Sequence, residues 1–372
     1  ARARYSVRIP TEAAPRLDSI DALRGITIAG MIVVNDPGTW SAVYPPLEHA
    51  AWHGWTYTDT IFPFFLFLVG VSMALSFARR DALANPGAVF RHVAVRAAVL
   101  VGLGLVLNGL SFIVFHGERF RFAGVLQRIG LCVLLAGAVV LRGSARAAVP
   151  VAATLLLGYW ALLSSGPLDP AGNLAARVDR AVLGRHTWKP DYDPEGLLST
   201  LPAVATTLLG AAAGERLRRL GATPQAARDL FTAGTGAAVL GLLWGRVFPV
   251  NKSLWTSSYA VLTAGLAAIA LAALVWVVDV RGVRRWTAPF LWLGRNAIGA
   301  FVLSTLGAMA LLAVRVTGAD GKSRSLWNAI YRAAFDRFAD PRLGSLLFAL
   351  VYLALWTAVF GILYRRRIFL KI

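Results

Sequence analysis

The chain is poor in cysteine and in charged residues. Its single cysteine, Cys132, stands in an apolar run, so an internal disulfide and a metal site built from several cysteines are both excluded. Charged residues make up 15% of the 372 residues, whereas a soluble domain usually has about 25%. The shortage of charge therefore argues against a soluble fold.

Acidic residues are scarce relative to basic ones, and the formal net charge is +19. Such a charge is also found in proteins that bind nucleic acid. Here, however, the arginines stand in short clusters between long apolar runs, which is the pattern that the positive-inside rule produces in membrane proteins. We therefore expect no nucleic-acid partner and interpret the charge as a sign of membrane topology.

Apolar residues make up 57% of the chain, and many lie in runs close to or above the 18 residues that cross a bilayer as a helix. The alternating pattern of a membrane β-barrel is missing, so the sequence predicts an all-α polytopic membrane protein with about ten transmembrane helices. The first run has no small-residue cleavage site after it, which favours a span over a signal peptide. The predicted spans are residues 20–36, 58–78, 93–115, 123–141, 147–163, 196–213, 229–246, 256–278, 288–314 and 343–363.

The distribution of Lys and Arg predicts the orientation of these spans. Loop 37–57 contains neither residue and should lie outside, whereas the loops after the second, fourth, sixth and eighth spans are rich in Arg and should be cytoplasmic. Both termini are basic and should be cytoplasmic as well, so we expect a tail at 1–17 and a single membrane domain at 18–372. Segments 164–196 and 315–341 then lie outside, and the first of them should contain an amphipathic helix at the membrane surface.

The first two spans and the loop between them hold the first candidates for chemistry. His49 and His53 lie in the outer loop, and Asn35 ends the first span. A neutral imidazole can accept a proton from an amine or attack an acyl group itself, and a carboxamide can polarise a carbonyl oxygen. The alternative is that both histidines pack at the membrane interface. We expect no metal, because this histidine pair has no third ligand nearby.

Charged residues also stand at the ends of these two spans. Asp36 or Asp59 could orient a histidine and stabilise its charged form. Asp21 and Arg24 are spaced i, i+3 on one helical face, which favours a structural ion pair, with a supporting role at the site as the alternative. Polar groups at membrane depth are costly unless they are paired or face a cavity, so all four residues mark a candidate site.

Three polar residues further along the chain are candidates for binding a phosphorylated ligand. Arg128 follows Gln127 at the outer start of the fourth span, and Arg295 and Asn296 lie near the cytoplasmic end of the ninth. The guanidinium fork of Arg matches phosphate oxygens, although an Arg near a span end also snorkels to the interface without any ligand. No Gly-rich phosphate loop and no GxSxG elbow stands in a suitable context.

Several motifs resemble one family of membrane enzymes. The segments DSIDALRGITIAGMIVVN (18–35) and HAAWHGWTYTDTIFPFFLFLVG (49–70) are similar to the first hairpin of the heparan-α-glucosaminide N-acetyltransferase family. The likeness continues in the same order through FAGVLQRIG, YDPEGLLSTLP, VNKSLWTSSY, VVDVRG and LYRRRIFLKI, and it covers nearly the whole chain. Several separate motifs in matching order make the resemblance specific.

The resemblance implies an acetyl transfer across the membrane. The lysosomal member of the family passes an acetyl group from cytosolic acetyl-CoA to the amine of a terminal glucosamine on the far side. By resemblance His49 is the active histidine and Asn35 acts beside it, whereas His53 does not carry over, because the lysosomal member has Asn there. The chain begins near the first span, without that member's large luminal domain, so we expect a bacterial inner-membrane relative that acts on a small amino sugar or a cell-wall sugar.

Two mechanisms and two other functions stay open. Either His49 acts as a general base while the amine attacks acetyl-CoA directly, which we favour, or His49 is acetylated first. Pantetheine is narrow, so it can thread between spans toward Asn35 and His49 into a dry site. The alternatives to an acetyltransferase are an amino-sugar transporter that needs no CoA and a membrane scaffold without turnover. The expected partners are the acceptor sugar and the lipid bilayer, and the sequence leaves a homodimer open.

Overall fold

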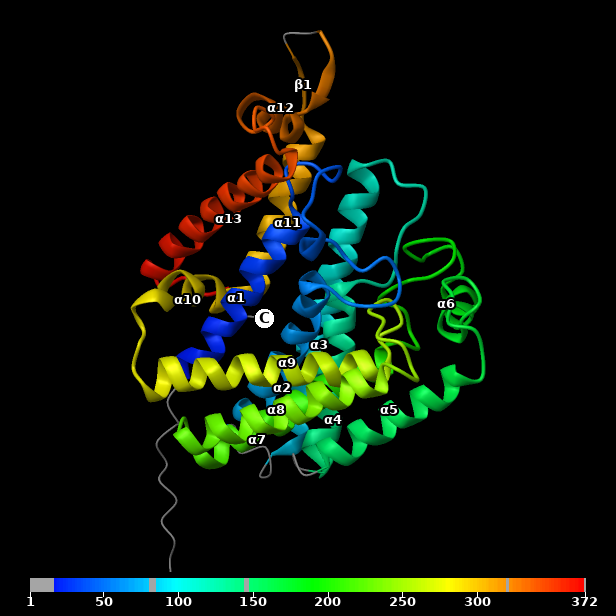
Figure 1. Cartoon of the computed structure of the whole chain (residues 1–372), viewed down its shortest axis with the longest axis vertical. Helices are drawn as coiled ribbons and strands as arrows, with labels where there is room; N and C mark the ends of the chain where they lie inside the picture. Colours follow the sequence, from blue (N-terminus) through cyan, green and yellow to red (C-terminus); the bar gives the residue numbers. More distant parts are fainter. Residues whose placement is uncertain (1–16, 80–84, 144–146, 319–320, 371–372) are drawn as a thin grey trace, which may run out of the picture.

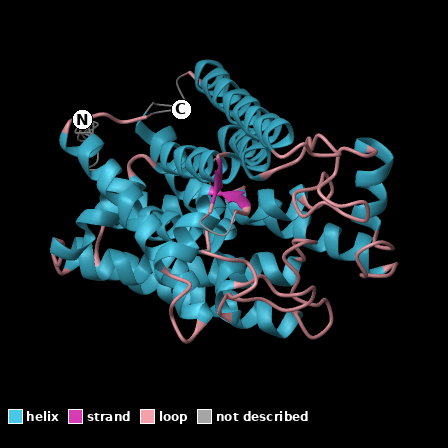
Figure 2. Ribbon diagram, turned by 90° about the horizontal axis from the view of Figure 1, so that it is seen from above, coloured by secondary structure: helices cyan, strands magenta, loops and turns pink. Residues whose placement is uncertain are grey.

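The computed structural model describes residues 17–79, 85–143, 147–318 and 321–370, and these are mainly helical (Figures 1 and 2). The predicted tail, apart from Leu17, lies outside the described residues. Each predicted span overlaps a helix. The helices are α1 (Asp18–Asn35), η1 (Pro45–Leu47), α2 (Tyr57–Arg79), α3 (Pro86–Val114), α4 (Val125–Gly143), α5 (Ala148–Ser164), α6 (Leu174–Leu183), α7 (Thr200–Leu220), α8 (Pro224–Trp244), α9 (Ser257–Leu274), η2 (Val275–Val280), η3 (Arg285–Thr287), α10 (Ala288–Gly294), α11 (Ala297–Ala313), α12 (Leu326–Ala334) and α13 (Pro341–Arg365).

The predicted ninth span, 288–314, is not one continuous helix. The chain bends by 72° between the helical segment that ends at Gly294 and α11. A Cβ at Gly294 would lie 1.9 Å from the carbonyl oxygen of Asp21, so only glycine lets α1 approach the end of α10 this closely. Hydropathy does not detect the break, because both halves are apolar. The bend places Arg295 and Asn296 at a helix junction instead of inside a span.

Five helices in the described part of the chain are long and apolar enough to cross a membrane, and the bent pair makes a sixth when it is counted as one span. These five are α2, α3, α4, α9 together with η2, and α13. By contrast, α5 has only 17 residues, and α7 ends in the charged run ERLRRL. The helices indicate a multi-pass membrane protein, whereas ten spans and cytoplasmic termini stay predictions.

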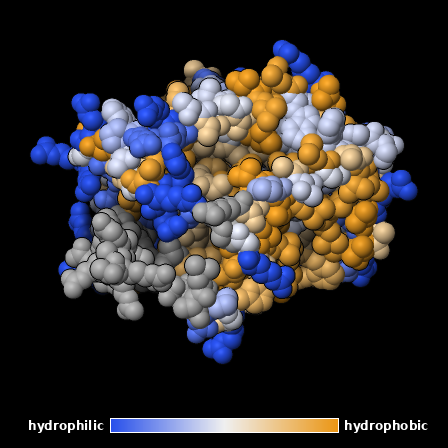
Figure 3. Space-filling view, turned by 90° about the horizontal axis from the view of Figure 1, so that it is seen from below, coloured by the Kyte–Doolittle hydropathy of each residue, from blue (hydrophilic) through white to orange (hydrophobic). Residues whose placement is uncertain are grey.

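The outer surface of the helices is widely apolar. Figure 3 shows a broad hydrophobic area on one face of the molecule. Exposed apolar patches on soluble monomers are usually small, so this surface suits helices that face lipid. Side chains that are at least half exposed on α3, α8 and α13 include Val95, Val106, Val239, Leu240 and Val351.

Two glycines bring α2 and α7 into backbone contact. A Cβ at Gly70 would lie 1.9 Å from the carbonyl oxygen of Thr207, and one at Gly210 would lie 2.0 Å from that of Phe67. Small residues allow helices to pack this closely in a membrane. Helix α2 also packs on α1, α4 and α9, so it is a central helix of the bundle (Figure 1). The loop that carries His49 leads directly into it.

Segment 315–341 contains secondary structure that was not predicted from the sequence. Strand β1 (Arg315–Thr317) pairs antiparallel with β2 (Ser323–Ser325), and α12 follows at once. Figure 1 shows the hairpin and α12 at one end of the molecule, beyond α11 and α13. Ser325 caps α12 by accepting a hydrogen bond from the N–H of Asn328 at 3.2 Å. The indole of Trp327 donates to the carbonyl oxygen of Gly38 at 3.2 Å, which ties α12 to the loop after α1.

Candidate active site

Hydrogen bonds at the start of α2 hold the carboxylate of Asp59 in a fixed position. Thr56 precedes the helix, and its backbone N–H donates to Oδ2 of Asp59 at 3.0 Å. The N–H of Asp59 donates in turn to the carbonyl oxygen of Thr56 at 3.2 Å. This exchange resembles a capping box, in which an acidic or amide side chain three residues into a helix satisfies the backbone at its start. Local sequence therefore holds Asp59 in place at the beginning of α2.

Asp59 holds His49 through its second oxygen. Nδ1 of His49 lies 2.6 Å from Oδ1 of Asp59, and the N–H of Ala50 donates to Oδ2 at 3.1 Å. The Asp59 side chain is only 1% exposed, whereas that of His49 is 51% exposed. Because a carboxylate accepts the hydrogen bond, Nδ1 carries the proton and Nε2 presents its lone pair. This arrangement leaves Nε2 as the imidazole atom that can accept a proton from a substrate.

Lys252 reaches the same imidazole from the loop between α8 and α9. Its Nζ lies 3.1 Å from Nε2 of His49. Asn251 shapes this loop, since its Oδ1 accepts the N–H of Leu254 at 2.8 Å and its own N–H donates to Oγ1 of Thr256 at 3.0 Å. Burial lowers the pKa of the Lys252 ammonium. Lys252 was not predicted as a site residue, although it stands in VNKSLWTSSY, one of the motifs on which the family resemblance rests.

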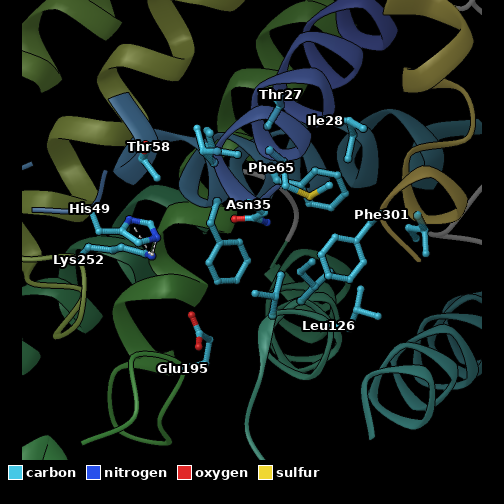
Figure 4. A pocket seen from close by; sticks show the side chains of 17 residues that line it. Thr27, Ile28, Asn35, His49, Thr58, Phe65, Leu126, Glu195, Lys252 and Phe301 are labelled. Carbon is cyan, nitrogen blue, oxygen red and sulfur yellow. Dashed lines mark hydrogen bonds between the residues drawn. The ribbon is translucent and has the colours of Figure 1, made fainter. Parts of the chain in front are cut away.

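His49 and Lys252 face a small cavity of about 110 Å³, which we call the outer cavity. Figure 4 shows the two side chains next to each other, with the Asn35 carboxamide and the Glu195 carboxylate pointing into the same space. Asn35 ends α1, and no hydrogen bond joins its side chain to another described residue. Most of the remaining wall is apolar and comes from α1, α2, α4 and α11. A carbonyl group in this cavity would meet few polar groups other than these four.

A second cavity, which we call the inner cavity, has a volume of about 620 Å³ and lies further along the same helices. Helix α1 contributes residues between Thr27 and Asn35 to the lining of the outer cavity, and Arg24 to the lining of the inner cavity. Three side chains, which we call the neck, line both cavities: Phe65, Ile129 and Ile298. The basic side chains that line the inner cavity are Arg24, His92, Arg96 and Arg295.

Glu195 enters the outer cavity from the loop that precedes α7. Arg121 forms ion pairs with both Glu195 and Asp193, and its Nε donates to Oδ2 of Asp193 at 2.9 Å. Both carboxylates are buried, so the pairs hold this loop rigidly at the cavity rim. Glu195 stands in the motif YDPEGLLSTLP, which contributes to the family resemblance, but it was not predicted as a site residue.

Asp21 and Arg24 pair with each other at the other end of α1. Nη1 of Arg24 lies 2.9 Å from Oδ1 of Asp21, and Nη2 donates to Oγ of Ser72 at 2.6 Å. A helix rises about 1.5 Å per residue, so Asp21 and Asn35 are about 21 Å apart along the axis. The ion pair therefore belongs to the inner cavity and does not reach His49.

Only one of the three predicted phosphate-binding residues lines a cavity. Arg295 borders the inner cavity and donates to Oδ1 of Asp18 at 3.0 Å. Asn296 is buried and binds the C-terminal segment instead, since its Oδ1 accepts the N–H of Leu370 at 2.8 Å and its Nδ2 donates to the carbonyl oxygen of Ile368 at 3.3 Å. Asn296 thus fixes the C-terminal segment, in which Leu370 helps to line the inner cavity.

Arg128 lies outside the lining of both cavities. It is 1% exposed, and its Nη2 donates to the carbonyl oxygen of Gly196 at 2.9 Å and to Oγ of Ser199. Its guanidinium stands 5.2 Å from the ring centre of Trp255. In this structure Arg128 therefore supports the loop that carries Glu195, and it does not reach the inner cavity.

Asp36 and His53 do not contact His49. Asp36 follows α1, and its N–H donates to the carbonyl oxygen of Ile32 at 3.1 Å. Nδ1 of His53 lies 3.4 Å from Nδ2 of Asn251, and the His53 ring packs edge-on against Trp52. Of the two aspartates considered for orienting a histidine, the structure places only Asp59 at that position.

Comparison with known proteins identifies the family. Residues 16–243 match the family model described as "Heparan-alpha-glucosaminide N-acetyltransferase, catalytic". The heparan-alpha-glucosaminide N-acetyltransferase of Homo sapiens is 29% identical over 77% of this chain and 52% of its own length, and that of Mus musculus is 26% identical over 80% and 54%. The chain thus spans about half the length of the curated relatives it matches. Because the family model covers more than half of the chain, including Asn35, His49 and Glu195, the chain belongs to the heparan-α-glucosaminide N-acetyltransferase catalytic family.

Proposed function

We propose that this chain is a transmembrane acetyltransferase that moves an acetyl group from cytosolic acetyl-CoA to the amine of an amino sugar on the periplasmic or extracellular side. The neck is the main support for this proposal, because Phe65, Ile129 and Ile298 line both an inner cavity rich in Arg and an outer cavity that is also lined by His49. A donor bound in one cavity can therefore present its acyl end in the other. The proposed location is the inner membrane of a bacterium.

The inner cavity suits the phosphorylated end of CoA. Arg24, Arg96 and Arg295 line it, and Arg forks bind phosphate oxygens well. Arg24 pairs with Asp21 and Arg295 pairs with Asp18, so both arginines are held in position at the cavity. Its volume of about 620 Å³ lies within the range usual for ligand pockets. The pantetheine arm of acetyl-CoA would then extend through the neck.

The outer cavity suits the reaction itself. The acceptor amine attacks the carbonyl carbon of the thioester, and Nε2 of His49 takes a proton from the amine nitrogen. The new C–N bond forms first and gives a tetrahedral oxyanion; the C–S bond then breaks as the C=O bond re-forms, and the departing thiolate takes up the proton from the imidazolium. The Asn35 carboxamide donates a hydrogen bond to the carbonyl oxygen, where negative charge develops. Asp59 keeps Nδ1 protonated and so keeps Nε2 available as the base.

Direct transfer fits these residues better than an acetylated histidine. Phe65, Ile129 and Ile298 line both cavities, so a donor in one cavity and an acceptor in the other would lie on either side of the same side chains and can be bound at the same time. Proton acceptance by His49 then needs no covalent step on the imidazole. Initial-rate lines for varied donor and acceptor should intersect, whereas parallel lines would point to a ping-pong route through acetyl-His49.

The deciding experiment uses vesicles that contain the purified chain, with isotopically labelled acetyl-CoA on one side and glucosamine or a cell-wall amino sugar on the other. We expect labelled N-acetylated sugar on the acceptor side. His49→Ala should lower the rate by about 1,000-fold, because general-base catalysis typically contributes about 10²–10⁴-fold. His53→Ala is the matched control and should keep the wild-type rate.

A different outcome would identify a different function. If the sugar crosses the membrane unmodified and without any need for acetyl-CoA, the chain is a transporter. If wild type and His49→Ala acetylate at equal rates, the assignment of His49 is wrong. Reversing the sides on which donor and acceptor are supplied tests the predicted orientation separately.

A further inference from the structure

Lys252 holds a position that packing alone does not explain. Its Nζ lies 3.1 Å from Nε2 of His49 and 3.4 Å from Nδ1, and the side chain lines the outer cavity together with Asn35. Figure 4 shows the ammonium group directed at the imidazole edge that faces the cavity. The positive charge is thus placed at the nitrogen that is expected to exchange a proton with the substrate.

This lysine is not held as part of an ion pair. Among the described residues, no carboxylate oxygen lies within 4.0 Å of its Nζ, although Glu195 and Asp59 are close enough to act on it electrostatically. Lys252 is half-buried and stands on a loop that Asn251 and Thr256 brace. An ammonium without a carboxylate partner, held at a cavity beside a candidate base, is a candidate for function.

We propose that Lys252 is a further catalytic residue, whose ammonium stabilises the oxyanion that forms on the thioester carbonyl during acetyl transfer. This inference rests on the proposed acetyltransferase function. When the amine attacks the carbonyl carbon, the π electrons of the C=O bond move to the oxygen, and Nζ of Lys252 donates a hydrogen bond to it. The oxyanion then collapses, the C=O bond re-forms, and the C–S electrons leave with the CoA thiolate.

In this arrangement three side chains have separate roles in the reaction. Nε2 of His49 receives the amine proton, Asn35 donates a neutral hydrogen bond, and Lys252 supplies the full charge. In the structure the ammonium rests against His49, and the flexible four-carbon stem of lysine lets it move to a substrate oxygen. A bound amine can then occupy the place at Nε2 from which the ammonium has moved. Charged donors in a water-poor site stabilise an oxyanion more strongly than neutral ones.

The surroundings of Lys252 make the role sensitive to pH. The groups that face its Nζ are His49, Asp59 and Glu195, with Arg121 and Arg128 further off. Burial lowers the pKa of the ammonium, Glu195 and Asp59 raise it, and the two arginines lower it again. The net direction is downward, so the wild-type rate should fall at an alkaline pH where an ordinary lysine would still be charged.

The test compares Lys252→Met and Lys252→Arg with the wild-type chain in vesicles. Lys252→Met should lower kcat by about 100-fold or more, since single oxyanion donors are worth about 10²–10³-fold, while KM for acetyl-CoA stays within about threefold. Lys252→Arg should recover part of kcat and should keep its rate at alkaline pH, because a guanidinium does not lose its proton there. Lys189→Met is the matched control, since Lys189 packs on Trp188 and Tyr192 in the segment between α6 and α7 and does not line the outer cavity.

Each result supports or overturns the inference. A kcat for Lys252→Met equal to that of wild type would overturn it, and so would identical alkaline profiles for wild type and Lys252→Arg. If Lys252→Met does not fold, the comparison of wild type with Lys252→Arg still decides through the alkaline profile. If the wild-type chain acetylates no amine at all, the proposed function fails instead. A wild type that is active beside an equally active Lys252→Met shows that only the role of Lys252 is wrong.

Discussion

Asp59 uses its two carboxylate oxygens for two purposes, because Oδ2 closes the first turn of α2 while Oδ1 holds Nδ1 of His49 at 2.6 Å. One residue thereby joins the start of a central helix to the candidate base. The helix sets the position of the carboxylate, and the carboxylate sets the tautomer and direction of the imidazole. The Asp59 side chain therefore has both a structural role in α2 and a proposed role in orienting the base.

Replacing Asp59 with Asn should impair catalysis more than binding. Asn can still accept a hydrogen bond at one atom, but it removes the charge that stabilises a protonated His49. We expect kcat to fall by about 100-fold, at the lower end of what general-base catalysis contributes, with KM for acetyl-CoA little changed. Steady-state kinetics in vesicles measures both values. Asp36→Asn serves as the control, since Asp36 does not contact His49, and an equal loss in both variants would contradict this role for Asp59.

Blocking the neck should separate donor binding from transfer. Ile298 lines both cavities, so Ile298→Trp should block the path that we propose for the acyl arm. We expect acetyl-CoA binding, measured by calorimetry or by filter binding, to stay near wild type while acetyl transfer is lost. Ile330→Trp adds the same bulk on α12, where Ile330 is 39% exposed, and should change neither quantity. Full transfer in Ile298→Trp would rule out the neck as the acyl path.

Releasing the C-terminal segment should weaken donor binding. Asn296 bonds the backbone on either side of Phe369, and both Phe369 and Leu370 line the inner cavity. Asn296→Ala removes both hydrogen bonds, so KM for acetyl-CoA should rise by about 3–10-fold, the equivalent of one or two ordinary hydrogen bonds, while kcat changes little. Asn296→Asp keeps the acceptor for Leu370 and should show a smaller rise. An unchanged KM in Asn296→Ala would mean that the segment takes no part in donor binding.

Asp179 should make stability depend on pH. Its Oδ1 accepts the N–H of Leu197 at 2.7 Å, and burial raises the pKa of Asp179 from 3.8 to about 6. Because the folded pKa is the higher one, this group favours the folded state below about pH 4, and its contribution is lost as the pH rises through about 6. Asp179→Asn keeps an acceptor oxygen but has no charge to bury. We expect its Tm in detergent to exceed that of wild type by about 2–4 °C at pH 8, with no such gain at pH 4. Equal Tm values at pH 8 would contradict this prediction.

The helical architecture could be predicted because the bilayer imposes a simple rule on sequence. Spans must be apolar and about 20 residues long, so the predicted runs all overlap helices. The rule fails where an apolar run hides a break, as at Arg295 and Asn296, because hydropathy does not report backbone direction. It also gives no guidance for segment 315–341, whose short hairpin and helix are held by contacts such as that between Trp327 and Gly38.

The candidate site divides in the same way. The sequence by itself determined the apolar helices, and its motifs indicated His49 and Asn35, since these depend on residues close together in the chain. Tertiary structure alone decided that Lys252 and Glu195 enter the outer cavity, that Arg24 and Arg295 belong to the inner one, and that Arg128 belongs to neither. The physical reason is that these placements depend on how distant helices pack. The hydropathy of the sequence indicates which residues prefer lipid, but it does not indicate which side chains face each other in the folded chain.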